Sequence, residues 1–365
     1  MPEPKVVWRS ESDAPMYTRL TPVDDRLRAD DALRRVKRGE HLLYTGDFHN
    51  ARQLLTAMGR RLERPSKAKS ALEAFREERE ARHREHETLS RIIVALDAQY
   101  RLQLSRAPDV ARTCLEVWGD AHGATTHVSF KTLLGMLGAA QWRAKGLEVP
   151  GLKGTLTPHW GVFTPTRTEY VELLAKVPVE AVKGARVFDV GTGTGVLGFV
   201  LLQRGAANVV ATDIEERAVK CARENAKALG LANRFSASVG DLFPEGRAGL
   251  VVFNAPWIPE APKNRADRAV YDEDGAVLRR FLSGLAEHLE PGGLGLLFLS
   301  DLPVLLGLRS AEWLQEQLSA AGLEVVWSHA GKAHHPKAKT RVDQLHSSRA
   351  KEVTTLYALR PRSET

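Results

Sequence analysis

The 365-residue sequence predicts an α/β fold, with a seven-stranded sheet in residues 151–365 and an all-helical domain in residues 1–150. Three observations predict this organisation. In the first part, leucines and alanines recur at three- and four-residue spacing, which is typical of helices. Around Gly146–Gly161, glycine, proline and threonine become abundant, as in a linker. Beyond this segment, apolar runs alternate with helical patterns, which indicates βαβ units and a parallel sheet.

The N-terminal domain is predicted to consist of helices behind a loosely packed, polar leader of residues 1–25. Residues 71–102 contain neither glycine nor proline and become apolar only after His86, which predicts one long helix, exposed first and buried later. The predicted helices are Asp31–Arg38, Asn50–Leu62, Ala71–Leu102, Val110–Val117 and Phe130–Ala139. Because the region holds no catalytic constellation, and its histidines have no partners at ligand spacing, we expect no metal site and interpret it as a substrate-recognition domain.

The remainder of the chain is predicted to form seven strands, with helices between most of them. The strands are Arg186–Val190, Asn208–Thr212, Arg234–Ser238, Gly249–Phe253, Gly293–Ser300, Leu323–Ser328 and Val353–Leu359. The helices are Thr168–Ala175, Val196–Gln203, Glu215–Leu229, Gly275–His288 and Ser310–Ala321. Because no helix is predicted between the last two strands, we expect them to form an antiparallel pair at the edge of the sheet.

A glycine-rich turn follows the first of these strands. The strand reaches Asp189, and then Gly191, Gly193 and Gly195 precede an apolar helix. Glycines allow a tight turn, and they let a ligand approach the backbone without a Cβ in the way. Free N–H groups at the start of the helix then face the ligand. The second strand is followed by Asp213, whose carboxylate can accept both hydroxyls of a ribose. This pattern predicts a nucleoside cofactor.

The glycines formally fit two classes of cofactor. The spacing Gly193-x-Gly195-x-x-Gly198 matches the dinucleotide fingerprint, but it begins two residues too late for a strand that ends at Val190. The glycine nearest the strand is Gly191. The arrangement resembles motif I of the class I S-adenosylmethionine (SAM)-dependent methyltransferases, which have a Rossmann-like sheet.

This resemblance implies SAM as the cofactor and assigns roles to several residues. In that family the glycine-rich turn contacts the methionine part of SAM, the acidic residue ending the second strand binds the ribose, and the acidic residue after the third strand meets the adenine amine. Asp213 and Asp241 hold the two acidic positions. The implied cofactor site comprises Asp189, Gly191, Thr192, Gly193, Thr194, Gly195, Asp213, Ile214, Asp241, Leu242 and Asn254.

The fourth strand is followed by the candidate catalytic residues Asn254, Ala255, Pro256 and Trp257. This run resembles the Asn-Pro-Pro-aromatic motif of the amino-methyltransferases, which methylate an amide or exocyclic nitrogen. Such a nitrogen is a poor nucleophile, so two acceptors, the Asn oxygen and the next carbonyl, orient it toward the methyl group. They also favour the positive charge that develops on nitrogen, while the aromatic ring stacks on the planar target. The first Pro of the motif is replaced by Ala255, which keeps the carbonyl but loses the fixed backbone angle.

Two further segments carry the resemblance, which runs from about residue 158 to residue 305. Gly161–Glu169 is similar to the segment that precedes motif I in the release-factor glutamine methyltransferases, and Ala269–Gly275 is similar to a Glu-Asp-Gly segment of the same enzymes. The first match implies that Arg167 contributes to substrate binding. The chain also resembles RNA guanine and adenine N-methyltransferases of the small-domain type.

Basic side chains are concentrated near the two ends of the chain. Lys and Arg outnumber Asp and Glu by 26 to 21 in residues 1–150 and by 8 to 3 in residues 331–365, whereas residues 151–330 hold 18 against 21. The densest stretch is the basic insertion Gly331–Lys351, which includes Lys337, Lys339 and Arg341. It starts where the carboxyl ends of parallel strands hold ligands, so we expect it to contact phosphates of an RNA substrate. The alternative is a solvated loop.

Other features exclude several classes of protein. No apolar stretch reaches the roughly 18 residues of a membrane span, and the two cysteines have no partner pattern. We therefore expect a cytoplasmic protein without disulfides or membrane contact. The leading hypothesis is a SAM-dependent N-methyltransferase of a macromolecule, either RNA and the ribosome or a glutamine of a translation protein. A SAM- or RNA-binding protein without catalysis and a small-molecule methyltransferase remain alternatives, and the sequence leaves the oligomeric state open.

Overall fold

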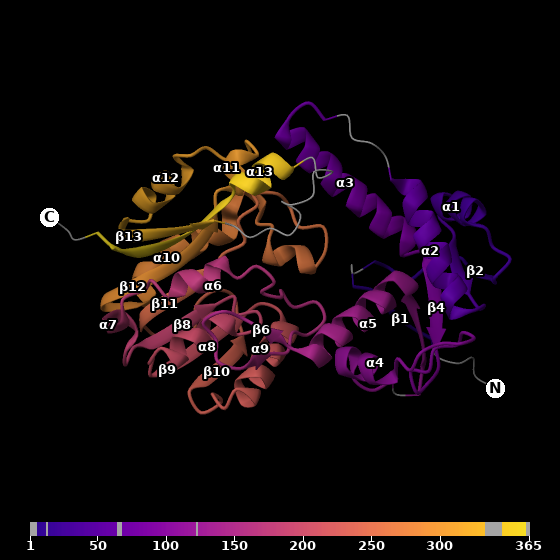
Figure 1. Cartoon of the computed structure of the whole chain (residues 1–365), viewed down its shortest axis with the longest axis horizontal. Coiled ribbons are helices and arrows are strands. Elements are labelled where there is room, and N and C mark those ends of the chain that lie inside the picture. Colours follow the sequence, from indigo (N-terminus) through magenta and orange to yellow (C-terminus); the bar gives the residue numbers. More distant parts are fainter. Residues whose placement is uncertain (1–5, 12–13, 64–67, 122, 333–344, 363–365) are drawn as a thin grey trace. The chain divides into compact units, whose positions relative to one another are not determined.

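The computed structural model describes residues 6–11, 14–63, 68–121, 123–332 and 345–362 (Figure 1). The chain divides into two compact units. The N-terminal unit comprises Met1–Lys69 and Glu73–Gln141, and the C-terminal unit comprises Ser70–Leu72 and Trp142–Thr365. The division after Gln141 precedes the domain boundary predicted at residue 150.

The N-terminal unit is an α/β unit, so the prediction of an all-helical domain was wrong. Its five-stranded sheet has the order β1-β5-β4-β3-β2. The strands are β1 (Val6–Arg9), β2 (Leu20–Val23), β3 (His41–Tyr44), β4 (Ile92–Leu96) and β5 (Thr125–Ser129). The helices are α1 (Ala29–Lys37), α2 (Phe48–Leu62), α3 (Ala71–Leu89), α4 (Ala111–Trp118) and α5 (Phe130–Lys145). Two strands therefore lie in the segment expected to be a loose leader.

The long helix predicted over residues 71–102 ends early because its last part is a strand. Helix α3 stops at Leu89, and Ile92, Ile93 and Val94 form most of β4. These three side chains are fully buried in the middle of the sheet. A strand buried on both faces has a continuous apolar run, which over five residues has the same appearance as a buried helix segment. The β-branched side chains were the signal that favoured a strand.

The C-terminal unit contains all seven predicted strands, in the order β10-β9-β8-β11-β12-β14-β13. They are β8 (Arg186–Val190), β9 (Asn208–Asp213), β10 (Phe235–Val239), β11 (Ala248–Asn254), β12 (Leu289–Ser300), β13 (Leu323–Lys332) and β14 (Val353–Pro361). Strand β14 pairs antiparallel with both β12 and β13, so the predicted antiparallel pair at the edge is confirmed. A small ladder joins β6 (Leu147–Glu148) and β7 (Thr155–Leu156).

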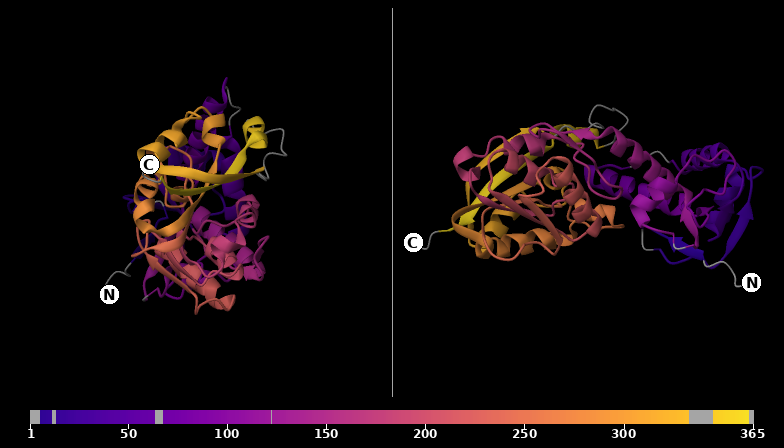
Figure 2. Two further views of the ribbon diagram at one scale, coloured as in Figure 1. Left: turned by 90° about the vertical axis from the view of Figure 1, so that its left-hand side faces the viewer. Right: turned by 90° about the horizontal axis from the view of Figure 1, so that it is seen from below.

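Helices cover both faces of this sheet, as the right-hand view of Figure 2 shows. The helices of the unit are α6 (Glu169–Leu174), α7 (Val179–Val182), α8 (Val196–Gln203), α9 (Glu216–Ala228), α10 (Ala276–His288), α11 (Leu302–Leu305), α12 (Trp313–Ala320) and α13 (His346–Lys351). Successive strand residues point to opposite faces, so Val187 joins the apolar layer of α6, α8 and α9, and Phe188 joins that of α10 and α12. Fully burying a side chain such as Phe188 contributes about 1.5–3 kcal/mol.

This topology brings four strand ends together. Strands β8, β9, β10 and β11 are parallel neighbours, so Val190, Asp213, Val239 and Asn254 end at the same edge of the sheet. In open α/β sheets, ligands bind at this carboxyl edge. The residues predicted to bind the cofactor and the methyl acceptor therefore converge there.

Candidate functional site

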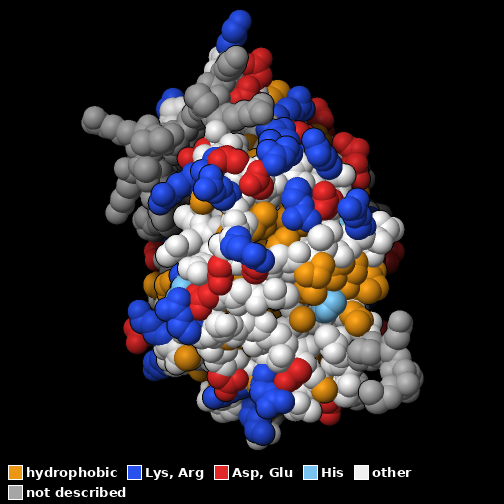
Figure 3. Space-filling model, turned by 90° about the vertical axis from the view of Figure 1, so that its right-hand side faces the viewer, with side chains coloured by type: hydrophobic (Ala, Val, Ile, Leu, Met, Phe, Trp, Pro, Cys, Tyr) orange, Lys and Arg blue, Asp and Glu red, His pale blue; other side chains and the backbone are white. Residues whose placement is uncertain are grey.

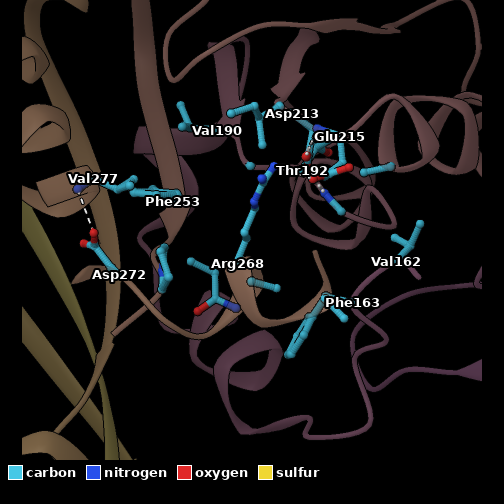
Figure 4. A pocket seen from close by; sticks show the side chains of 18 of the residues that line it. Val162, Phe163, Val190, Thr192, Asp213, Glu215, Phe253, Arg268, Asp272 and Val277 are labelled. Atoms are coloured by element: carbon cyan, nitrogen blue, oxygen red, sulfur yellow. Dashed lines mark hydrogen bonds and ion pairs between the residues drawn. The ribbon is translucent and has the colours of Figure 1, made fainter. Parts of the chain in front are cut away.

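A cavity of about 410 Å³ opens at the carboxyl edge of the C-terminal sheet (Figure 4). Its walls come from the ends of the four parallel strands and from Gly161–Phe163. They also include residues of the segment that follows Asn254–Trp257, the predicted motif for binding the methyl-accepting nitrogen, called the acceptor motif below. Ten of the predicted site residues line it. They are Gly191, Thr192, Gly193, Thr194, Asp213, Ile214, Asp241, Leu242, Asn254 and Pro256.

The glycine-rich turn forms one wall because its backbone is left-handed at successive glycines. Gly191 and Gly193 have φ angles of +61° and +54°, a region that side chains with a Cβ rarely adopt. A Cβ on Gly191 would lie 3.2 Å from the ring of Phe253. Gly195, predicted to bind the cofactor, is not among the lining residues; it is the N-cap of α8, and a Cβ there would lie 2.3 Å from the ring of Phe199. The missing Cβ leaves room for this ring, and a cofactor contact of Gly195 stays a prediction.

Asp189 lies beneath the turn and does not line the cavity. Its side chain is buried, and its Oδ2 accepts hydrogen bonds from Thr192 Oγ1 at 2.7 Å and from Gly198 N at 3.2 Å. Burial raises the pKa of this carboxyl to about 7. Asp189 therefore holds the turn in shape, although the sequence had predicted it as a cofactor contact.

Asp213 is the acidic group that faces the cavity. One carboxylate oxygen accepts a hydrogen bond from Gly193 N and the other from Glu215 N, each at 2.9 Å. Burial raises the pKa of Asp213. A carboxylate fixed by backbone donors at the end of the second strand is suited to accept the hydroxyls of a ribose. Beside it, the exposed side chain of Ile214 offers an apolar surface for a flat base.

The third strand end places Asp241 at the cavity with an ion-pair partner of its own. Asp241 Oδ1 lies 2.6 Å from Arg280 Nη2 of α10. Leu242 has a left-handed backbone (φ +65°), a conformation that costs about 1–2 kcal/mol in a residue with a side chain. The Thr212 hydroxyl donates to the carbonyl of Leu242 and holds this turn. The turn thus presents Asp241 beside the base-binding end of the cavity.

Only two of the four residues of the predicted acceptor motif line the cavity. Asn254, the last residue of β11, lines the cavity together with Pro256. Its side-chain amide has no hydrogen-bond partner among the described residues, so it is free to bind an acceptor. Ala255 is fully buried in the core and is not among the lining residues. The ring of Trp257, predicted to stack on the target, lies outside the cavity wall, 5.7 Å from the guanidinium carbon of Arg167.

Of the predicted substrate-binding residues, only Arg167 is placed by the structure. Its guanidinium donates hydrogen bonds to Glu169 and Glu352 and does not line the cavity. Lys337, Lys339 and Arg341 lie outside the described residues. At the far end of the basic insertion, Arg349 is buried, whereas Lys351 is exposed.

Comparisons with known proteins agree with this geometry. A profile of the ribosomal protein L11 methyltransferase (PrmA) family matches residues 165–255. A putative protein N5-glutamine methyltransferase of Methanocaldococcus jannaschii is 33% identical over 164 residues, covering 43% of this chain and 80% of that protein. The chain belongs to the class I SAM-dependent methyltransferases. It is therefore an enzyme with SAM as its cofactor.

Two other matches differ in how much of each chain they cover. The release factor glutamine methyltransferase of Deinococcus radiodurans is 38% identical over 165 residues, covering 41% of this chain and 59% of that protein. Among solved structures, the ribosomal protein L11 methylase of Lactobacillus delbrueckii subsp. bulgaricus aligns with 20% identity and a TM-score of 0.37, over 57% of this chain and 81% of that one.

The cavity of the methyltransferase fits SAM in size and in the chemistry of its walls. Its volume lies in the range of about 300–1,000 Å³ that is usual for small-ligand sites. The bare backbone at Gly191 and Gly193 would hold the methionine part, and Asp213 the ribose. Among the described residues, no group of His, Cys, Asp and Glu is suited to hold a metal ion. Within the same ranges, no helix is long and apolar enough to span a membrane.

Sequence reasoning missed an arginine that crosses the methyltransferase cavity. Arg268, from a short 3-10 helix (η1, Ala266–Ala269), lines the cavity and lies 3.1 Å from Glu215 Oε1 (Figure 4). The pair joins the segment after the acceptor motif to the residue two positions beyond Asp213. No periodicity or motif distinguishes Arg268 from the other basic residues of its loop. Only the fold brings it to the cofactor side.

Proposed function

We propose that this methyltransferase transfers the methyl group of SAM to a planar amide or amino nitrogen of a macromolecule, and that its preferred acceptor is the side-chain amide of a protein glutamine. The observation that carries the proposal is the position of Asn254. Its free side chain lies in the same cavity as Asp213 and the glycine-rich turn, at the carboxyl end of the strand next to the turn. A methyl donor and a nitrogen acceptor can thus meet there.

The residues of the cavity account for the chemistry that an amide nitrogen needs. SAM, when bound, supplies an electrophilic methyl group. The Asn254 oxygen accepts an N–H of the acceptor and turns the nitrogen lone pair toward the methyl group, so the gain is mainly one of orientation. The same oxygen dipole stabilises the positive charge that develops on the nitrogen. Pro256 shapes the adjoining wall.

The relatives support glutamine as the acceptor. The relative that is matched over 80% of its length is named a putative protein N5-glutamine methyltransferase. The matched relative from Deinococcus radiodurans, covered over 59% of its length, is named a release factor glutamine methyltransferase. We propose by analogy that the substrate is a protein of the translation apparatus, which the N-terminal unit recognises. The cytoplasmic location stays a prediction.

An exocyclic amino group of an RNA base is the second candidate acceptor, and the basic insertion favours it. Among its described basic residues, Lys332 and Lys351 at the two ends are exposed, whereas Arg349 is buried. On the face drawn in Figure 3, by contrast, the described Lys and Arg side chains are interspersed with Asp and Glu, without the continuous basic stripe that follows a nucleic-acid backbone. If RNA is the substrate, its affinity must fall steeply as salt rises. Affinity that is negligible, or insensitive to salt, removes this candidate.

The acceptor class is tested with methyl-labelled SAM and a lysate separated into RNA, protein and small molecules. We expect label in the protein fraction. The Asn254→Ala variant should keep SAM binding and lose turnover, because the glycine-rich turn and Asp213 still hold the cofactor while the methyl-accepting nitrogen loses the group that orients it. Asn208→Ala is the matched control, since Asn208 is exposed at the opposite end of β9, a strand of the same sheet that is separated from β11 by β8. Full turnover in Asn254→Ala would contradict the proposal, and label in RNA or small molecules would change its acceptor.

A further inference from the structure

A buried ionic network lies outside the cavity wall, where the C-terminal strand begins. Its hub is Arg167, just before α6. The guanidinium donates from Nε to Glu169 Oε1 at 2.7 Å and from Nη1 to Glu352 Oε1 at 2.9 Å. It also donates from Nη2 to Thr354 Oγ1 at 3.3 Å. Each of its three nitrogens has a partner, so most of the donor groups of Arg167 are used inside the network.

The burial of this network is far deeper than that of ordinary ion pairs. The side chains of Glu352 and Glu169 are 0% and 3% exposed, and that of Arg167 is 16% exposed. Charged residues are almost never buried this fully unless they are paired, because removing them from water is costly. The Ser300 hydroxyl also donates to Glu352 Oε1 at 2.6 Å. The guanidinium is therefore held in one orientation by groups from two separate parts of the chain, and Ser300 from a third part fixes Glu352.

One face of this fixed guanidinium meets the acceptor motif. The Arg167 guanidinium carbon lies 5.7 Å from the centre of the Trp257 ring, within the range of a cation–π contact. The other end of Trp257 is fixed too, because its backbone N–H donates to the carbonyl of Val270 at 3.1 Å. Trp257 follows Asn254 by three residues, so the position of the ring constrains the turn that presents the Asn254 side chain.

We propose that Arg167 is a positioning residue for the acceptor motif, and that Glu352 holds it in place. The inference rests on the proposed function of Asn254 and deepens it. Arg167 and Glu352 are 185 positions apart in the sequence. A local sequence motif can therefore reveal the pairing of Arg167 with Glu169 but not its pairing with Glu352. Arg167 acts through Trp257 and touches neither cofactor nor acceptor.

The test compares Arg167→Lys and Glu352→Gln with Glu324→Gln. Lysine keeps the charge of Arg167 but loses its fork of donors, and glutamine keeps the shape of Glu352. Glu324 is the matched control because it forms an exposed ion pair with Arg360 on the neighbouring strands β13 and β14, 2.6 Å apart. Trp257 emission is isolated by subtracting the spectrum of Trp257→Phe. Thermal unfolding identifies the variants that fold.

We expect both network variants to shift the Trp257 emission and to leave the SAM dissociation constant within twofold of the wild type. With the labelled acceptor, kcat should fall by about tenfold or more, because small misplacements of reacting groups are costly. Glu324→Gln should change none of these quantities. Unchanged Trp257 emission in a folded Arg167→Lys or Glu352→Gln protein would overturn the inference, as would an unchanged kcat.

The emission measurement also separates this inference from the proposed function. If the wild type labels no acceptor, the proposed function fails, and the Trp257 emission alone decides whether Arg167 holds the ring. If the wild type is active and Asn254→Ala is inactive, while the network variants keep full kcat, only the positioning role is lost. Should Arg167→Lys fail to fold, Glu352→Gln, which leaves the pairing of Arg167 with Glu169 intact, provides the same comparison.

Discussion

Replacing Gly191 by alanine tests the glycine-rich turn at the point where its geometry is most demanding. The residue has a φ angle of +61°, and holding an alanine there costs about 1–2 kcal/mol. The new Cβ would lie 3.2 Å from the ring of Phe253, which is itself buried in the core. Displacing a packed ring adds about 1–3 kcal/mol. We therefore expect the free energy of unfolding to fall by about 2–5 kcal/mol.

Gly230→Ala is the control that isolates the backbone cost. Gly230 has a φ angle of +70°, and its Cβ would meet no atom within 4 Å. Chemical denaturation should therefore show a loss of only about 1–2 kcal/mol. Calorimetry with SAM should show at least about tenfold weaker binding for Gly191→Ala, which corresponds to 1.4 kcal/mol. Gly230→Ala should bind SAM as the wild type does.

The two alanine variants also show what would refute this reasoning. Gly191 lines the cavity whereas Gly230 does not, so the account requires a difference between them in both measurements. Equal losses of stability would show that Phe253 yields at no cost. Unchanged SAM affinity in Gly191→Ala would show that the cofactor does not lie against the turn.

Two further predictions concern buried and cavity-lining charges. The pKa of Asp189 is raised to about 7 by burial, so between about pH 4 and pH 7 the native state binds more protons than the unfolded state, and stability contributed by this group falls as pH rises. Asp189→Asn should flatten that slope in denaturation curves recorded across this range, and an unchanged slope would contradict the assignment. Arg268 forms an ion pair with Glu215, and both residues line the cavity. If SAM must break this ion pair to enter, Arg268→Gln should remove a cost of about 0.2–1 kcal/mol and raise SAM affinity by up to about fivefold. Weaker binding in calorimetry would show instead that Arg268 is itself a cofactor ligand.

The C-terminal sheet was predictable because most of its strands are distinct apolar runs separated by helical patterns. Strand β8 has the predicted bounds, and the others differ mainly at their ends. The sheet of the N-terminal unit was missed because its strands are only four or five residues long and its pairing is remote. Strand β1, for example, pairs with β5, whose residues lie more than a hundred positions away. Such short strands carry little periodicity of their own.

The site was predictable where strand ends determine it and unpredictable where side chains from distant segments meet. Gly191, Asp213 and Asn254 line one cavity because parallel strands end at one edge. Trp257 and Arg167 do not line it, since neither a motif nor its spacing specifies which way a side chain turns. Glu352, the partner of Arg167, lies just before β14, 185 positions further along the chain, and has no local signature.

The most direct test of the account is to locate the transferred methyl group. The labelled protein fraction is digested, and the modified peptide is sequenced by tandem mass spectrometry. The account predicts one methyl group on the side-chain nitrogen of a glutamine, present with the wild type and with Asn208→Ala and absent with Asn254→Ala. A methyl group on lysine, on a carboxylate or on a nucleobase would contradict the assignment of glutamine, and labelling that persists in Asn254→Ala would contradict the role of the acceptor site.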